Sequence, residues 1–355
     1  MNCSGCSPIY PIEGQGTLYL RPISPALLEA LQTLQTPGRL IETSDDMMWM
    51  HFSNLETVQN LIEEIGEIDP TLRDSLTVQI MPIYEQANEE SWISLTMQES
   101  RFKHAELVSI ILEHQFSSHM QPIVDASEQI IGYEFLLRPA ENGKSFSSYE
   151  LFEVARETGL HSFLDRLARI TAIETSALFL PHGVKRFVNF LPSSIYNPEY
   201  CLTHTFEAIE RLSLDPKDFV FEVVETEQIQ HMPILQQIFE VYRSRGMSVA
   251  LDDVGAGYST IELMNRLEPD FVKIDRSLID RCDQDSTKQQ KILHIVEMSS
   301  RFGGQVLAEG IERMEEFEFC RSIGIELAQG YYFGKPSAKP PGGPYSNTSS
   351  NSWNN

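Results

Sequence analysis

The feature that most constrains this chain is a series of seven short apolar runs, each closed by a carboxylate, an amide or a lysine. The runs lie between Gly132 and Phe333, and helix-length segments separate them. An apolar run of four to six residues that ends in a polar residue is typical of a buried parallel strand. The closing residues are Glu134, Asn189, Glu222, Asp252 with Asp253, Lys273 with Asp275, Glu309 and Gln329.

The segments between these runs have the periodicity of helices. The predicted helices span 148–160, 161–179, 203–213, 231–245, 259–267, 286–302 and 313–323. Alternation of strand and helix over about 220 residues predicts a parallel sheet, and this many units favours a closed (β/α)8 barrel. The carboxyl ends of the strands then meet on one face, where such barrels keep their active sites.

The sequence outside the barrel indicates a smaller domain and flexible ends. Residues 16–84 have the order βαββαβ, which suggests a small ferredoxin-like α+β domain that acts as a scaffold or sensor. The chain is expected to comprise a flexible N-terminus (1–15), this domain with a polar linker (16–100), a connecting amphipathic helix (101–117), the barrel (118–336) and a disordered tail (337–355).

The composition narrows the class of partner. A formal net charge of −24, from 51 acidic and 27 basic residues, argues against nucleic acid or an anionic membrane surface as the main partner. No apolar window is long enough to span a membrane, and the N-terminus lacks the features of a signal peptide. Five widely spread cysteines fit a reducing cytoplasm. Cys3 and Cys6 form only half of a zinc site.

Five carboxylates are expected to meet at the strand ends. Two bare carboxylates about 4 Å apart repel by about 4 kcal/mol at an effective dielectric of 20, so cations are needed to offset the cluster. Oxygen ligands favour Mg²⁺ or Mn²⁺ over zinc. The adjacent Asp252 and Asp253 allow one carboxylate to bridge two ions, a device for in-line displacement at phosphorus. Lys273 supplies a fixed positive charge, and Arg138 is placed to grip a phosphate.

Other interpretations of these residues exist. A single acidic residue at the end of a strand is more often a solvated end or a helix cap, and Asp253 in particular is placed to cap the turn that follows it. Lys273 is alternatively a structural partner of Asp275. A barrel glycosidase would use two of the carboxylates, but Asn189, Lys273 and the adjacent aspartates argue against that class.

From about Ser118 to Pro336 the chain resembles the EAL-type cyclic di-GMP phosphodiesterase domain. The resemblance covers about six-tenths of the chain and rests on motifs in a fixed order. These are Gln121-Pro-Ile-Val, Glu134-Phe-Leu-Leu-Arg138, Val-Asn189, Glu222-Val-Val-Glu225, Asp252-Asp253-Val-Gly-Ala-Gly, Lys273-Ile-Asp275, Glu309-Gly-Ile-Glu312 and Gln329-Gly-Tyr-Tyr-Phe.

The resemblance implies a modified eight-stranded barrel with one strand running against the others, and hydrolysis of cyclic di-GMP to pGpG. It implies that two ions, Mg²⁺ or Mn²⁺, are held by Glu134, Asn189, Glu222, Asp252 and Asp253, and that Ca²⁺ inhibits. Lys273 would position the water, and Glu309 would be a general base or a water-mediated ligand. Substrate contacts or their immediate support are implied for Gln121, Arg138, Glu312 and Gln329. Glu225 would hold the flexible loop, and the barrel would form a homodimer.

Three positions depart from the family pattern. Phe135 replaces the alanine of the name motif, Val224 replaces a threonine, and the loop after Asp253 reads Val-Gly-Ala256-Gly. Phe135 should face away from the metals, because neighbours along a strand alternate. The loop changes leave an alternative function open: a receptor that binds cyclic di-GMP without turnover and signals through the N-terminal domain.

Overall fold

The computed structural model describes residues 14–22, 41–44, 47–68, 75–83, 85–89, 92–223, 232–255 and 261–340. The chain divides into two compact units. One is Met1–Phe116 with Pro139–Leu164, and the other is Ser117–Arg138 with Asp165–Asn355. Among the described helices, none combines the length and the apolar character that crossing a bilayer requires.

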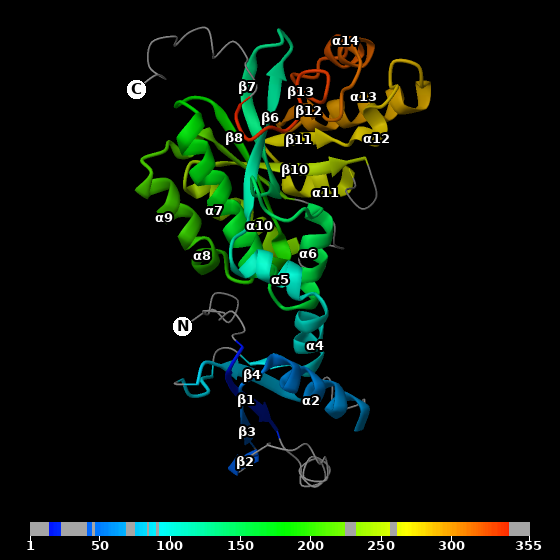
Figure 1. Ribbon diagram of the computed structural model, residues 1–355. Coiled ribbons are helices and arrows are strands. Elements are labelled where there is room, and N and C mark those ends of the chain that lie inside the picture. Colours follow the sequence, from blue (N-terminus) through cyan, green and yellow to red (C-terminus); the bar gives the residue numbers. More distant parts are fainter. Residues whose placement is uncertain are drawn as a thin grey trace. The chain divides into compact units, whose positions relative to one another are not determined.

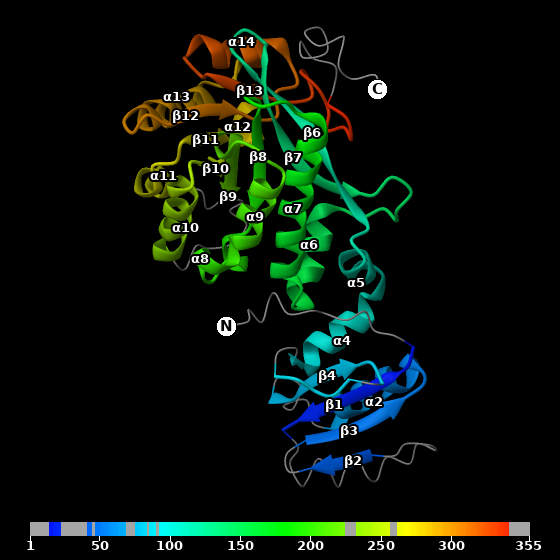
Figure 2. The same ribbon diagram turned by 90° about the vertical axis from the view of Figure 1, so that its left-hand side faces the viewer.

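The first unit holds an antiparallel five-stranded sheet (Figure 2). Its strands are β1 (Gly16–Arg21), β2 (Ile41–Ser44), β3 (Met47–Phe52), β4 (Thr77–Met81) and β5 (Ile93–Ser94), in the order β2-β3-β1-β4-β5. β3 lies between β1 and β2, and β1 lies between β3 and β4, as in a split βαβ sheet. This order agrees with the ferredoxin-like prediction, with β5 added at one edge. The helix expected between β1 and β2 falls outside the described residues.

Helix α2 (Leu55–Ile68) covers one face of this sheet. Asn54 caps it, because the Asn54 Oδ1 accepts a hydrogen bond from the Glu56 backbone N–H at 2.9 Å. Apolar side chains at helical spacing then face Leu18 and Leu20 of β1. The buried residues of the helix are Val58, Leu61, Ile62 and Ile65.

The segment after β5 differs from the sequence expectation. Instead of a linker to residue 100 and one helix over 101–117, there are two helices, α4 (Leu95–Lys103) and α5 (Ala105–Leu112). α4 starts early because the Ser94 Oγ caps it, accepting from the Met97 N–H at 3.2 Å. His104, with φ −109° and ψ 31°, separates the two helices. In the same unit, Arg101 donates to the Thr158 carbonyl, just beyond α6 (Ser148–Glu157).

The second unit is a closed eight-stranded barrel (Figure 1). Its strands are β6 (Phe116–Asp125), β7 (Ile130–Pro139), β8 (Lys185–Phe190), β9 (Phe219–Val223), β10 (Ser248–Val254), β11 (Phe271–Ile274), β12 (Gln305–Ala308) and β13 (Leu327–Gln329). Neighbours from β7 to β13 pair in parallel, whereas β13 and β6 are antiparallel. The predicted barrel with one reversed strand is therefore confirmed.

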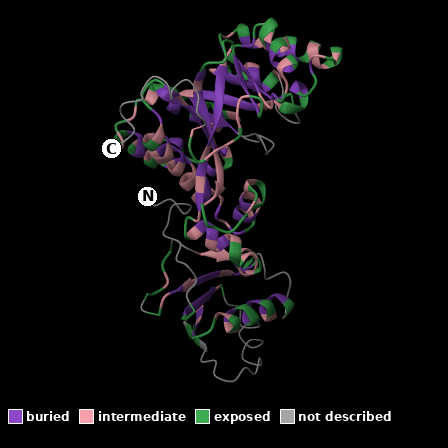
Figure 3. Cartoon of the chain, turned by 45° about the horizontal axis from the view of Figure 1, so that its top comes forward, coloured by how far each residue is buried: buried purple, intermediate pink, exposed green. Residues whose placement is uncertain are grey.

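The helices that alternate with the strands begin and end within three residues of the predicted ranges. In the second unit they are α7 (His161–Phe179), α9 (Thr203–Arg211), α10 (Met232–Ser244), α11 (Ile261–Leu267), α13 (Ser286–Ser300) and α14 (Met314–Ser322), and α6 belongs to the first unit. Short α8 (Pro198–Cys201) and α12 (Arg276–Ile279) follow β8 and β11. Figure 3 shows the strands largely buried and the outer sides of the helices exposed, as an amphipathic helix on a barrel requires.

The side chains inside the barrel explain where the site lies. One inward-facing apolar cluster fills the interior and comprises Ile123, Phe187, Val220, Ala250, Phe271, Leu307 and Leu327. Because side chains alternate along a strand, the residue two positions further faces the same way. Those residues, from β8 to β13, are Asn189, Glu222, Asp252, Lys273, Glu309 and Gln329. The polar site therefore lies one pleat closer to the carboxyl ends of the strands than the apolar interior does.

The start of the expected tail is also ordered. Ser337 forms an antiparallel bridge with Met120, with backbone N–O distances of 2.8 and 3.0 Å. The sequence expectation of disorder from residue 337 is therefore wrong at its first residue. Residues 341–355, and Cys3 and Cys6 at the other end, fall outside the described residues.

Candidate active site

Glu134 of β7 lies at the centre of the side chains that were predicted to meet. Its Oε1 accepts a hydrogen bond from the Asn189 Nδ2 at 3.0 Å, and its Oε2 accepts from the Gln329 Nε2 at 2.6 Å. Glu134 is 6% exposed, so its carboxylate is held by β8 and β13 rather than by water. Phe135 faces the other way and packs in the apolar cluster between strands and helices, as strand alternation predicts.

Lys273 brings four carboxylates together. Its Nζ lies 2.8 Å from the Glu222 Oε2, 3.0 Å from Asp252, 2.8 Å from Glu309 and 3.5 Å from Glu134. The Lys273 side chain has no exposed surface. The alternative in which Lys273 pairs with Asp275 is wrong, since Asp275 caps α12 by accepting from the Ser277 N–H at 2.9 Å.

The carboxylates form two overlapping groups with the geometry of cation sites. Oxygen atoms of Glu134, Glu222 and Asp252 lie within 4.8 Å of one another, and so do those of Asp252, Asp253 and Glu309. Asp252 belongs to both groups. This is the arrangement in which one carboxylate serves two neighbouring ions.

Two buried oxygens support this interpretation. The Glu222 Oε1 and the Gln329 Oε1 are buried and receive no hydrogen bond from the residues that the structure describes. A buried acceptor left unpaired costs about 1–3 kcal/mol, and a divalent cation or its water would satisfy both atoms. The donor set is all oxygen, so the residues present fit a hard cation such as Mg²⁺ or Mn²⁺.

The charges in the cluster are not balanced by protein groups alone. Burial raises the pKa of Glu222 and of Glu309 well above the usual value, despite Lys273. Burial also raises the pKa of Asp253, to about 6, with the Asp252 charge adding to the shift. In Glu134 the raising effect of burial is outweighed by Lys273 and by the hydrogen bonds from Gln329 and Asn189, so its pKa is lowered.

Lys273 remains charged in these surroundings. Burial alone would lower its pKa, but the carboxylates of Asp252, Glu134, Glu222 and Glu309 raise the pKa well above the usual value. Among the described residues, the five carboxylates of the cluster therefore share one ammonium group, which pairs with four of them. Additional positive charge at this place would stabilise their ionised forms.

The backbone at Asp253 is unusual. Asp253 has φ 52°, in the left-handed region that residues other than glycine seldom adopt. Its N–H donates to the Asp252 Oδ1 at 2.8 Å, which orients one carboxylate of the pair. The turn that Asp253 was alternatively predicted to cap spans 254–257, and residues 256 and 257 fall outside the described residues.

The predicted substrate-binding residues are less closely gathered. Arg138 lies at the end of β7, and its Nη1 donates to the Leu137 carbonyl at 2.7 Å. Gln121 of β6 is buried, and its Nε2 donates to the Gly334 carbonyl at 3.2 Å. Glu312 is not part of the cluster, because its carboxylate pairs with Arg276 at 2.6 Å. Glu225 falls outside the described residues.

Sequence reasoning missed a buried ion pair beside the site. On α7, Asp165 pairs with Arg169, and both are 2% exposed. The Asp165 carboxylate also accepts from the Leu191 N–H at 2.9 Å and from the Ser194 Oγ at 2.5 Å. It thereby holds the turn that follows Asn189. The signal in the sequence was an acid and an arginine four residues apart on an otherwise apolar helix face.

Fold and site together define an α/β-barrel protein with a carboxylate-rich site at the carboxyl ends of its strands. The family model of the EAL domain matches residues 104–336. The chain therefore belongs to the EAL domain family, whose members include proteins named as cyclic di-GMP phosphodiesterases.

Three similar proteins illustrate the relationship. The probable cyclic di-GMP phosphodiesterase PdeG of Escherichia coli K12 is 29% identical over 226 residues, which cover 61% of this chain and 43% of PdeG. The chain thus spans less than half of that relative. The cyclic di-GMP-bound standalone versatile EAL protein of Vibrio cholerae O395 has 33% identity and a TM-score of 0.59, with coverage of 64% of this chain and 95% of the other.

The third is the calcium and cyclic di-GMP complex of Klebsiella pneumoniae BlrP1 at pH 8.0. Its similarity covers 91% of this chain and 96% of the BlrP1 chain, with a TM-score of 0.57 and 22% identity. At that identity the likeness concerns the fold. It extends beyond residues 104–336 into the N-terminal region.

Proposed function

We propose that this chain is a two-metal-dependent phosphodiesterase that opens cyclic di-GMP to pGpG in bacterial second-messenger signalling. The observation that carries the proposal is that two clusters of three carboxylates share Asp252, next to a Glu222 Oε1 that has no hydrogen-bond partner among the described residues. Membership of the EAL family and its phosphodiesterase-named relatives support the choice of substrate.

The proposal assigns each side chain near the cluster a role toward the metals. Glu134, Asn189, Glu222 and Asp252 would hold one Mg²⁺ or Mn²⁺, and Asp252 with Asp253 would hold the second. When bound, such ions supply neutralising charge and lower the pKa of a water toward about 7. Ca²⁺, larger and less strict in its geometry, would bind at the same residues and inhibit turnover.

The protein groups would then act on the water and the phosphate. Glu309 would accept a proton from the attacking water, since it lies at the rim of the cluster with its side chain 17% exposed. Lys273, 2.8 Å from Glu309, would hold positive charge beside the developing negative charge at phosphorus. Arg138, Gln121 and Glu312 would contact the nucleotide, Gln329 would hold Glu134 in place, and Glu225 would steady the neighbouring loop.

The test is hydrolysis by the purified chain with Mg²⁺ or Mn²⁺, followed by separation of the nucleotides. We expect pGpG from the wild type, loss of product with a chelator, and a folded Glu134→Gln variant that is about 100-fold slower or more. Loss of a proposed ligand should cost at least as much as loss of a residue that orients one, which costs about 10- to 100-fold. Intact substrate with both metals would reject the proposal. Calorimetric binding without product would instead support a cyclic di-GMP receptor that signals through the N-terminal domain.

The proposal extends to the rest of the molecule. The N-terminal domain would regulate the barrel, the barrel would form a homodimer, and the protein would act in the cytoplasm. The net charge of −24 supports a small nucleotide rather than a nucleic acid as the ligand. Sedimentation of the full chain, with and without cyclic di-GMP and Ca²⁺, tests the dimer.

A further inference from the structure

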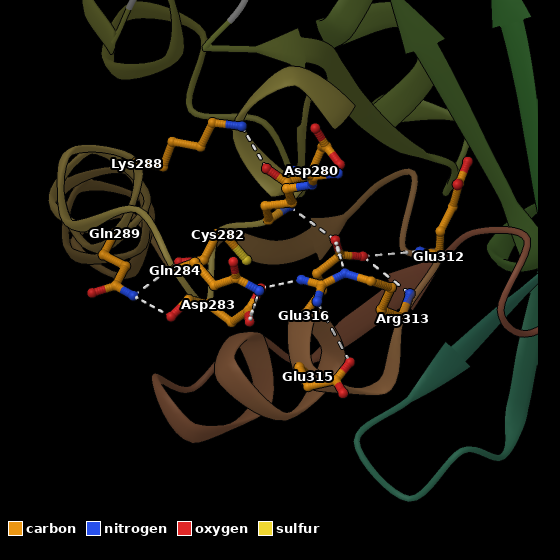
Figure 4. A network of polar contacts seen from close by, with 11 residues as sticks. Asp280, Cys282, Asp283, Gln284, Lys288, Gln289, Glu312, Arg313, Glu315 and Glu316 are labelled. Carbon is orange, nitrogen blue, oxygen red and sulfur yellow. Dashed lines mark hydrogen bonds and ion pairs between the residues drawn. The ribbon is translucent and has the colours of Figure 1, made fainter.

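One buried carboxylate outside the cluster, that of Glu316 in α14, gathers four hydrogen bonds (Figure 4). Its Oε1 accepts from the Arg281 N–H at 2.9 Å and from the Arg313 Nε at 3.0 Å. Its Oε2 accepts from the N–H groups of Glu312 at 3.0 Å and Arg313 at 3.1 Å. Three of the four donors are backbone groups, so this side chain fixes main-chain positions.

The donors belong to two segments that leave neighbouring strands. We call Asp275–Asp285, which follows β11 and Lys273, the β11 extension. Glu309–Arg313, which follows β12 and begins with Glu309, is the β12 extension. Glu316 accepts from the β11 extension at Arg281 and from the β12 extension at Glu312 and Arg313. It therefore links the segment that begins with Glu309 to the segment that directly follows the strand of Lys273.

The two extensions run side by side from the barrel to Glu316. The Glu309 N–H donates to the Ile274 carbonyl at 3.1 Å, as a continuation of the strand pairing. Arg276 packs so closely on Gly310 that an added Cβ there would lie 2.3 Å from the Arg276 Cγ. Arg276 also pairs with Glu312 at 2.6 Å. The Arg313 side chain adds an ion pair with Asp283 of the β11 extension.

Glu309 depends on this support. Within the described part of the chain, its carboxylate has one ion-pair partner, Lys273 at 2.8 Å. Glu134, in contrast, is held by Asn189, Gln329 and Lys273. The position of the Glu309 carboxylate is thus set mainly by its backbone, which the β12 extension carries.

We propose that Glu316 is a positioning residue that sets the place of Glu309 against Lys273 by holding the β11 and β12 extensions together. The role rests on the proposed phosphodiesterase activity for its consequence in turnover, and on the hydrogen bonds alone for its consequence in structure. Glu316 is suited to it because it is 1% exposed and its four bonds satisfy both carboxylate oxygens.

The first experiment compares Glu316→Gln with Glu315→Gln in the full chain. The amide nitrogen that Glu316→Gln introduces cannot accept the bonds that one carboxylate oxygen accepts now. Glu315 is exposed, and its ion-pair partner among the described residues is Arg313, at 3.7 Å. We expect Glu316→Gln to lower kcat by about 10- to 100-fold, the range for groups that orient a metal or catalytic ligand, and to change KM by a smaller factor, through Glu312. Glu315→Gln should match the wild type. Unchanged kcat in Glu316→Gln would overturn the proposal.

A double-mutant cycle separates positioning from general destabilisation. If Glu316 acts through Glu309, then Glu316→Gln adds little further loss of kcat in a Glu309→Gln background. Multiplying losses would mean that Glu316 acts elsewhere, and would overturn the role. Should Glu316→Gln fail to fold, Arg313→Gln keeps the backbone donors and removes the links to Asp283 and the Glu316 Oε1; a smaller loss of kcat in the same direction is then expected.

Hydrogen exchange tests the inference without turnover. In Glu316→Gln, amides of Asp280–Asp285 and Glu309–Arg313 should exchange faster than in the wild type, while amides of β10 exchange as before. If the amides of both extensions exchange at the same rate in Glu316→Gln as in the wild type, the proposal is overturned, whether or not the chain hydrolyses cyclic di-GMP. A wild type without turnover but with faster exchange in the variant would reject the proposed function and leave the role of Glu316 standing.

Discussion

The ammonium of Lys273 lies 2.8 Å from the Glu222 Oε2, and neither side chain is exposed to solvent. A charged pair in such a place is stable only if each charge is matched. Lys273 matches part of the charge of the Glu222 carboxylate, and the other Glu222 oxygen remains unpaired among the described residues. Lys273 is therefore the internal cation of this site, and a bound metal ion, as proposed above, would complete the compensation.

Replacement of this internal cation tests that relationship. We expect Lys273→Met to destabilise the metal-free protein, because breaking a buried pair typically costs about 3–5 kcal/mol. The loss of stability should lie at the lower end of this range. The pKa values of Glu222 and Glu309 are raised, so these carboxylates can take up protons when the Lys273 charge is removed. Mn²⁺ should restore more stability to Lys273→Met than to the wild type. Thermal melting with Mn²⁺ and with a chelator measures both effects.

A matched control is Lys291→Met, which removes an exposed lysine on α13. It should melt as the wild type does, with the same response to Mn²⁺. Equal Mn²⁺ responses in Lys273→Met and Lys291→Met would mean that Lys273 and the metal do not compensate the same charges.

The strand-end residues were predictable because their signal is local. An apolar run fixes the strand, and the period of two places Phe187 in the interior and Asn189 at the site. The period of two does not predict how deeply a strand-end side chain is buried. Glu134 is buried because Asn189 of β8 and Gln329 of β13 hold its carboxylate, and these strands meet around it only when the barrel closes. Nor does the period of two reach Glu316, whose donor Arg281 lies 35 positions away along the chain. That contact requires α14 to pack against a turn, and no periodicity encodes it.

Gly330 gives a stability prediction at the edge of the site. A Cβ added there would lie 2.0 Å from the Ile311 carbonyl oxygen and 2.3 Å from the Ile311 nitrogen. Neither backbone atom can move freely, because the Ile311 N–H donates to the Gln329 carbonyl at 3.0 Å. We expect Gly330→Ala to lower the free energy of unfolding by about 1–3 kcal/mol or more. It should also weaken Mn²⁺ binding, because Gln329 is displaced from Glu134.

Gly183→Ala is the control. Gly183 has φ +85°, and apart from its chain neighbours no described residue lies within 4 Å of an added Cβ. The change therefore tests backbone strain, which costs about 1–2 kcal/mol. Denaturant unfolding and Mn²⁺ calorimetry compare the two variants. If Gly330→Ala binds Mn²⁺ as tightly as Gly183→Ala does, the place of Gln329 does not depend on its contact with Ile311.

Asp165 provides a test of the turn beyond Asn189. Asp165→Asn leaves the buried Arg169 without its counter-charge, and a buried pair broken in this way typically costs about 3–5 kcal/mol. The Leu191 N–H can still donate to the amide oxygen of the new side chain, so the turn keeps part of its support. We therefore expect a large fall in the unfolding midpoint with a small effect on Mn²⁺ affinity. A large loss of Mn²⁺ affinity at unchanged stability would mean that Asp165 supports the metal site and not the stability of the fold.

Asp253 contributes to the pH dependence of the stability measured without metal. Burial and the neighbouring Asp252 raise its pKa from 3.8 to about 6. Between these values the folded protein keeps a proton that the unfolded chain releases, so the stability falls as the pH rises through that window. Glu222 and Glu309, whose pKa values are also raised, act with the same sign. Asp253→Asn should make the fall shallower, as measured by denaturant unfolding in the presence of a chelator.

Metal binding should release the proton that Asp253 retains in the folded, metal-free protein. Because a carboxylate binds a cation in its ionised form, Mn²⁺ should displace the Asp253 proton below a pH of about 6 and bind more tightly as the pH rises. Calorimetry in two buffers of different ionisation enthalpy counts the protons released. We expect the wild type to release more protons than Asp253→Asn at about pH 5.5, with the difference vanishing near pH 8, where Asp253 is already ionised. Equal proton release at the lower pH would mean that Asp253 is ionised before the metal arrives.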